Sequence, residues 1–171
     1  IPLRGSVVLP LAVSPLSVSR QVSIDAVQRA LSGDRMVVFL KQKQDIEDPT
    51  PDDLHRVGTV AIIRQMSAGP NGLRLLVEGI ARVQAEFMTR DGALLKALIR
   101  PKPEPAVLTV EVEAHVRHVH ELVERALSVA TGLSPDMKQL VSAIDDPLRL
   151  AYVLAGLLDL KADDKIGRAH V

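Results

Sequence analysis

The first hundred residues alternate between short apolar runs and turn-forming residues, a pattern that is typical of β-strands. We predict strands where apolar positions are dense or alternate, at residues 6–9, 36–40, 57–66, 73–77, 83–88 and 93–100. The sequence Gly69-Pro70-Asn71-Gly72 between two of these runs predicts a tight hairpin, because Asn and Gly tolerate positive φ. Pro10 and Pro15 deter regular pairing, so we expect residues 10–20 to form an extended loop.

Helical spacing of apolar residues is found in two parts of the chain. A first helix is predicted from Ser19 to the stop at Ser32-Gly33, with one apolar face made by Ile24, Val27 and Leu31. A second, longer helix is predicted to end near residue 132, and its apolar positions are Val112, Val116, Val119, Val123 and Leu127. Ser134-Pro135 and Asp146-Pro147 are typical helix starts, so the second half is predicted to be all helical.

A proline-rich stretch separates the two halves. In Pro101-Lys102-Pro103-Glu104-Pro105 every second residue lacks an amide proton, and we expect a hinge at 101–106. The predicted fold class is α+β: a small β-barrel with one helix at 1–100, followed by an all-helical bundle at 107–165. Residues 166–171 resemble the translation of a common sequencing adapter, so we expect a non-native tail there and a reading frame that continued past Lys165.

Composition narrows the class of protein. Lys plus Arg and Asp plus Glu are equal at 21 each, and two Phe, one Tyr and no Trp leave no aromatic platform, so we do not expect a nucleic-acid partner. The absence of cysteine excludes disulfides and thiolate chemistry and favours a reducing, cytoplasmic setting. No apolar run is long enough to predict a membrane span.

Candidate catalytic or metal-binding residues are few. No Gly-Lys-Ser or Gly-Lys-Thr is present to hold nucleotide phosphates, and the serines fall at turns and helix starts, where they cap the backbone. Glu111, His115 and His118 share one stripe of the long helix, but without a fourth ligand a solvated face is favoured over a zinc site. Glu78 and Arg82 are spaced to form a structural ion pair. We therefore predict no catalytic residue and no metal site.

Binding remains the best-supported kind of function. In the segment 10–20, apolar side chains are interleaved with small residues, and the prolines deter regular pairing, so an exposed patch for unfolded chains is one interpretation of this segment. The predicted polypeptide-binding residues are Leu11, Val13, Leu16, Val18, Arg20 and Gln21. The alternative is that these residues only cap the barrel.

Many short motifs along the chain resemble, in the same order, the amino-terminal substrate-binding domain of Lon-type ATP-dependent proteases. They include Pro2-Leu3-Arg4, Pro15-Leu16-x-Val18, Val57-Gly58-Thr59-Val60-Ala61, Val77-Glu78-Gly79-x-x-Arg82 and Ile144-Asp145-Asp146-Pro147. The chain departs from the family pattern at two positions: Ser19 stands where the family usually has glycine, and Asn71 replaces the commoner aspartate of the hairpin turn. The first departure puts any substrate contact at Ser19 in doubt.

The resemblance implies a PUA-like, partly open β-barrel followed by helices, acting as the substrate-recognition and assembly domain of a serine protease that degrades misfolded and regulatory proteins. The implied partners are unfolded or damaged polypeptide and further subunits of a six-membered ring. ATP and magnesium would belong to an ATPase module outside this chain, as would the protease module, so we expect no enzyme activity and no cofactor in the chain alone. A stand-alone Lon-like polypeptide-binding protein and, more remotely, a PUA-like RNA binder remain alternatives.

Overall fold

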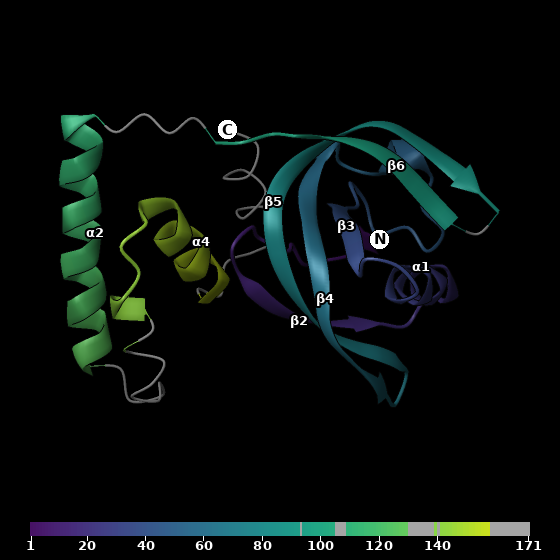
Figure 1. Cartoon of the computed structure of the whole chain (residues 1–171), viewed down its shortest axis with the longest axis horizontal. Helices are drawn as coiled ribbons and strands as arrows, with labels where there is room; N and C mark the ends of the chain where they lie inside the picture. The colour runs from purple at the N-terminus through teal and green to yellow at the C-terminus, as the bar shows by residue number, and fades with distance from the viewer. Residues whose placement is uncertain (93, 105–108, 130–138, 140, 158–171) are drawn as a thin grey trace.

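A strongly curved β-sheet forms the first part of the protein (Figure 1). The computed structural model describes residues 1–92, 94–104, 109–129, 139 and 141–157. The sheet order is β1-β3-β4-β5-β2, and β6 pairs with a later part of β5 than β2 does. The strands β1 and β3 run parallel, and the other pairs are antiparallel. The strands are β1 (Pro2–Leu3), β2 (Val13–Val18), β3 (Met36–Lys41), β4 (Val57–Gly69), β5 (Gly72–Asp91) and β6 (Leu94–Pro101).

The β4–β5 hairpin is the longest pairing in the sheet, and it confirms the turn predicted at Gly69-Pro70-Asn71-Gly72. Gly69 pairs with Gly72 across the turn, and the ladder continues to Val57 opposite Gln84. The strands predicted at 73–77 and 83–88 are one continuous strand, β5, with register shifts along its pairing with β4 and with β6. These irregularities bend β5, so that its first half pairs with β2 and its second half with β6.

Two predictions near the amino end are wrong. Residues 6–9 form no strand, although Val8 and Leu9 are buried. Val13–Val18, predicted as an unpaired loop, is the strand β2, with Pro15 opposite Leu76. Proline is tolerated there because β2 lies at the edge of the sheet, where one side of its backbone needs no partner.

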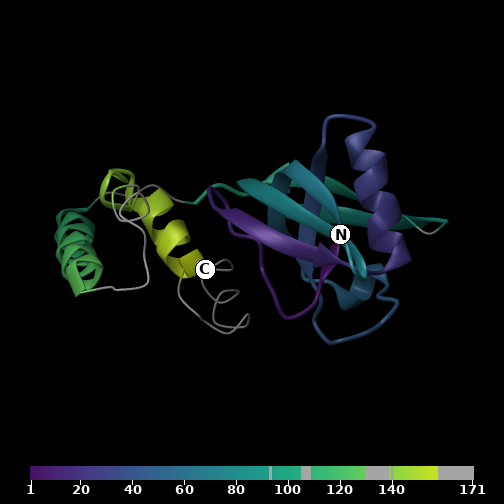
Figure 2. The same cartoon turned by 90° about the horizontal axis from the view of Figure 1, so that it is seen from below.

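The helix α1 (Gln21–Leu31) covers one opening of the curved sheet (Figure 2). Val27 is fully buried in a core with Phe39, Ile63 and Val77, and Ile24 and Leu31 pack against that core as their spacing predicted. A one-turn 3-10 helix, η1 (Pro51–Asp53), lies in the loop between β3 and β4. The α+β fold class is therefore confirmed.

The remaining described helices are α2 (Val110–Val129) and α4 (Pro147–Leu157). Both contribute to an apolar cluster whose buried members are Leu127, Val141 and Leu150. Three predictions concern residues outside the described ranges: the helix start at Ser134-Pro135, the helix end near 132 and the tail at 166–171. Within the described part of the chain, no helix is both long and apolar enough to span a bilayer.

Candidate functional site

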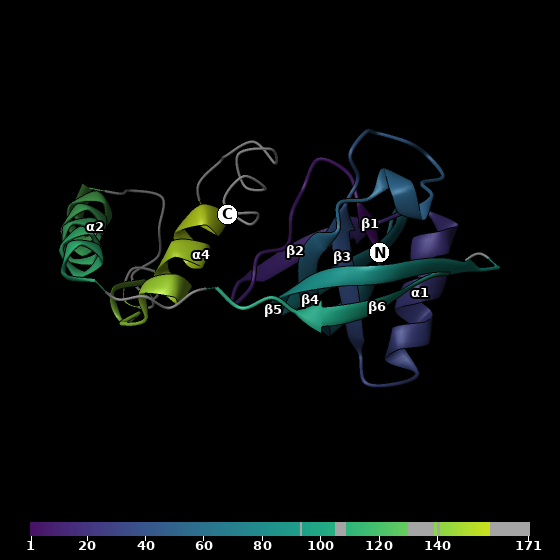
Figure 3. The ribbon, with the colours of Figure 1, turned by 90° about the horizontal axis from the view of Figure 1, so that it is seen from above.

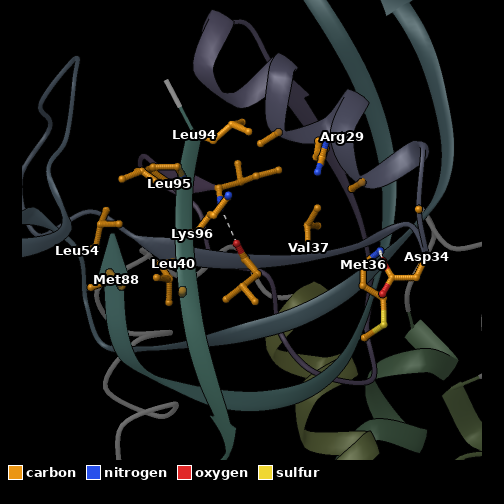
Figure 4. A pocket seen from close by; sticks show the side chains of 17 residues that line it. Arg29, Asp34, Met36, Val37, Leu40, Leu54, Met88, Leu94, Leu95 and Lys96 are labelled. Atoms are coloured by element: carbon orange, nitrogen blue, oxygen red, sulfur yellow. Dashed lines mark hydrogen bonds between the residues drawn. The ribbon is translucent and has the colours of Figure 1, made fainter. Parts of the chain in front are cut away.

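An apolar cavity of about 320 Å³ lies between α1, β3 and β6 (Figure 4). From above, the β5–β6 pair extends past β3 and crosses α1 (Figure 3), and Met88 and residues 94–97 of this pair line the cavity. Leu94 and Leu95 line the cavity from β6, Val37 lines it from β3, and Ala26 and Ala30 line it from α1. Ala26 and Ala30 have small side chains, so α1 leaves space next to it that the leucines of β6 do not fill.

A second cavity, of about 530 Å³, adjoins the first at the amino end of α1. Pro2 and Leu95 line both cavities, so the two adjoin at these residues, and we call the two together the α1 groove. The second cavity is more polar, since Arg20, Gln21 and Glu47 line it. The α1 groove therefore has an apolar end along α1 and a polar end at the start of that helix.

Arg20 is the best-fixed charge at the polar end. Its guanidinium donates hydrogen bonds to the carbonyl oxygens of Pro2 at 2.7 Å and Glu47 at 3.2 Å. Burial, and after it the charge of Arg4, lower the pKa of Arg20 below its ordinary value, and nearby carboxylates partly offset this. Arg20 nevertheless stays cationic at neutral pH because an arginine begins so far above it.

The loop between β3 and β4 closes the polar end. Asp48 accepts a 2.6 Å hydrogen bond from Arg90 of β5, and Arg4 pairs with Asp45 at 2.8 Å. The Thr50 backbone N–H and hydroxyl both donate to Asp53, at 2.8 and 2.6 Å. Asp45 and Asp48 thus fasten this loop to Arg4 and Arg90.

The chemistry available in the α1 groove is that of binding. Among the residues the structure describes, no three His, Cys, Asp or Glu side chains gather as a metal site would require. His115 contacts the carbonyl oxygen of Glu111 at 2.8 Å, whereas His118 lies 3.8 Å from Glu121, so the two imidazoles make separate contacts. An apolar wall with a few fixed polar groups is the usual character of a site that holds a ligand by shape and burial.

The predicted polypeptide-binding residues fall into three groups. Arg20 and Gln21 line the polar end of the α1 groove. Val18 is buried, and Leu16 packs against the same core, so the structure removes the Val18 side chain from any exposed surface. Leu11 and Val13 are exposed, at 40% and 58%, and lie away from the groove beside Gly79 and Glu78 of β5.

Sequence reasoning missed the apolar end of the groove. The sequence predicts Val37, Leu94 and Leu95 as ordinary strand residues, and nothing local distinguishes them from core positions. The ion pair predicted between Glu78 and Arg82 is also wrong. Glu78 pairs with Arg64 at 2.6 Å, and Arg82 turns to the other face of β5, where it lies 3.3 Å from Glu104.

The fold and the α1 groove together define a binding domain: a curled sheet covered by one helix, with an apolar groove and a helical extension. The sequence model of the family described as the ATP-dependent protease La (LON) substrate-binding domain matches residues 1–167. The chain therefore belongs to the family of LON substrate-binding domains.

Curated relatives agree with this assignment. The chain is 36% identical to a Lon protease of Endomicrobium trichonymphae over 168 residues and to one of Trichlorobacter lovleyi over 171 residues. Each alignment covers 96% of this chain but only 21% and 20% of the relative. The chain thus spans about a fifth of the length of these relatives.

Two solved structures have a similar fold. The amino-terminal domain of Mycobacterium avium complex Lon protease matches with a TM-score of 0.79 at 20% identity, covering 100% of this chain and 88% of that one. A Lon amino-terminal domain protein from Xanthomonas campestris matches with a TM-score of 0.53 at 21% identity, covering 91% and 95%. At these identities the likeness concerns the fold alone.

Proposed function

We propose that the chain is the substrate-recognition and assembly domain of a Lon-type ATP-dependent serine protease, and that the α1 groove holds a segment of unfolded polypeptide. The observation that carries the proposal is the open apolar wall formed by Leu94, Leu95 and Val37 across from the alanines of α1. Unfolded chains expose apolar side chains, which gain free energy by leaving water in such a groove. Arg20 and Gln21 offer hydrogen-bonding groups at the other end.

The role within a longer protein follows from the family. A domain that holds unfolded chains raises their local concentration near a protease module, which in such proteins lies elsewhere in the polypeptide. We propose that the full-length protein is a cytoplasmic ring of six subunits that uses ATP and magnesium to degrade misfolded and regulatory proteins. The chain alone has neither peptidase nor ATPase activity in this proposal. A stand-alone polypeptide-binding protein, the alternative, would use the same groove.

The domain organisation is part of the proposal. We infer that residues 1–100 act as a PUA-like barrel, that 101–106 act as a hinge and that 107–165 form a helical bundle. The apolar cluster shared by α2 and α4 around Leu127 and Leu150 supports the bundle.

Two leucines of β6 provide a matched test of the groove. Leu95 lines both ends, whereas Leu98 is 60% exposed on the same strand and does not line the groove. Because burial of a Leu side chain by a ligand contributes about 1.5–3 kcal/mol, Leu95→Gln is expected to weaken binding of an unfolded polypeptide by about tenfold to a hundredfold. Leu98→Gln is the control and leaves the affinity nearly unchanged.

Binding is measured by fluorescence anisotropy with labelled, reduced and carboxymethylated lactalbumin. Leu95 also packs against the cluster around Leu40 and Ala85, so circular dichroism and thermal melting must accompany each titration. Ala26→Leu gives a second test, because it fills the groove from α1 without removing a core side chain. Equal affinities for the native sequence, Leu95→Gln and Ala26→Leu would refute the groove as the binding site.

A further inference from the structure

The helical part of the chain touches the barrel through one face of α4. Tyr152 packs against Leu9 and Ala12, which lie in the segment entering β2, and Val7 and Ala155 border the contact. Tyr152 is only 8% exposed. This apolar contact is small, since it joins only two short stretches of chain, and by itself it is a weak determinant of orientation.

A buried charge lies next to this contact. Arg82 of β5 is 5% exposed, and its Nε donates a hydrogen bond to the carbonyl oxygen of Lys102 at 3.0 Å. The same Nε lies 3.3 Å from Oε1 of Glu104. The backbone N–H of Lys102 in turn donates to the carbonyl oxygen of Arg82 at 2.9 Å. The proline-rich stretch after β6 is therefore held against the barrel at Lys102 and Glu104.

Glu104 also binds the helical part. The Tyr152 hydroxyl donates a hydrogen bond to Oε1, the carboxylate oxygen that faces Arg82. Burial, and after it this hydrogen bond, raise the pKa of Tyr152 above its ordinary value, so the hydroxyl remains a donor at neutral pH. One carboxylate oxygen thus connects β5, the stretch after β6 and α4.

We propose that Arg82, Glu104 and Tyr152 form a latch that fixes the orientation of the helical part on the barrel. When the latch is closed, the chain after β6 is held at Lys102 and Glu104, and α4 cannot turn away from Leu9 and Ala12. When the charge of Glu104 or the hydroxyl of Tyr152 is removed, the link between β5 and α4 is weakened, and the small apolar contact is left to hold α4 against the barrel. The latch thereby determines the direction in which the chain leaves the barrel.

The test measures the distance between the two parts in solution. The chain has no cysteine, so Ser67→Cys on β4 and Arg117→Cys on α2 give two unique labelling sites at exposed positions. Spin labels at these sites report the distance distribution by double electron–electron resonance. The informative variants are Glu104→Gln, which removes the charge at constant size, and Tyr152→Phe, which removes the hydroxyl and keeps the ring in its apolar contact.

A matched control removes an ion pair elsewhere. Glu78→Gln removes the charge of the surface pair between Glu78 and Arg64, which joins β5 to β4 within the barrel. The native sequence and Glu78→Gln are expected to give one narrow distribution, and both latch variants a broader one that extends to longer distances. Because the two oxygens act in one network, the double variant should be no broader than either single variant.

Two results would overturn the latch. One is a narrow, unshifted distribution in both Glu104→Gln and Tyr152→Phe while circular dichroism shows native helix content. The other is a distribution that is already broad in the native sequence. Tyr152→Phe decides the question even if Glu104→Gln lowers stability, because phenylalanine preserves the packing against Leu9.

Discussion

Gly79 lies so close to the backbone of Leu9 that a β-carbon on Gly79 would overlap the carbonyl oxygen of Leu9. The crossing is fixed by two backbone hydrogen bonds of 2.9 Å, from Leu11 to the carbonyl oxygen of Gly79 and from Gly79 to that of Ala12. Only glycine permits this approach, because every other residue carries the β-carbon. The glycine of the Val-Glu-Gly motif therefore brings the segment entering β2 against β5.

Gly79→Ala is expected to lower the free energy of unfolding by about 1–3 kcal/mol, because the added methyl group forces the two backbones apart. Gly156→Ala on α4 is the control: among the described residues, no atom outside its chain neighbours and its own helix backbone lies within 4 Å of the added β-carbon, and in a helix this change raises stability by about 0.5–1 kcal/mol. Urea unfolding followed by circular dichroism measures both. Equal stability of the native sequence and Gly79→Ala would contradict the close approach.

The elements predicted best from the sequence are those with local signals. The Asn71-Gly72 turn is specified by four consecutive residues, and β4 and β5 follow from it because a hairpin turn fixes the register of its strands. The helix α1 follows from the spacing of Ile24, Val27 and Leu31 on one face. The α+β class follows from the change of period after the proline-rich stretch.

What the sequence did not predict depends on contacts between distant residues. Pro15 argued against a strand, and β2 forms because β5 offers a partner and because an edge strand tolerates the missing N–H. Arg82 pairs with Glu104 rather than with Glu78, because residues four apart along an extended strand are far from each other. The α1 groove is assembled from α1, β3 and β6, which no single window of sequence contains.

Thr59 joins the segment before β2 to β4 by a buried hydrogen bond. Its hydroxyl, on a residue 4% exposed, donates to the carbonyl oxygen of Val8 at 2.7 Å. Thr59→Val keeps the shape but leaves that carbonyl unpaired, so a loss of about 1–3 kcal/mol is expected. Thr59→Ser keeps the hydroxyl and loses one methyl group, about 0.8 kcal/mol. Chemical denaturation should rank native above Ser above Val, and a Val variant as stable as the native protein would show that the bond contributes nothing.

The ion pair of Asp48 with Arg90 predicts a pH dependence of stability. The hydrogen bond from Arg90 is the main cause that lowers the pKa of Asp48 below its ordinary value of 3.8. Since the unfolded chain then takes up the proton more readily, the stabilisation is present above 3.8 and is lost as the pH falls through the lowered pKa.

The melting temperature of Asp48→Asn should therefore lie below that of the native protein at neutral pH, and the difference should vanish in strong acid. Arg90→Gln should show the same difference with the same pH profile, because it removes the other partner of the pair. A difference that stays constant across the acid range would mean that the pair is not the cause.

Leu11 and Val13 remain exposed after folding and form a second candidate contact for polypeptide. Ile80, 43% exposed, lies next to Gly79 on β5, the residue whose carbonyl oxygen accepts the hydrogen bond of Leu11. A long unfolded chain can reach both this patch and the α1 groove, whereas a short peptide that fills the groove cannot.

Val13→Ser is thus expected to weaken binding of carboxymethylated lactalbumin severalfold and to leave the binding of a short apolar peptide unaffected. Val110→Ser on α2, where the valine is 81% exposed, is the control and should change neither affinity. If Val13→Ser weakens the short peptide as strongly as the long chain, the patch and not the α1 groove is the primary site.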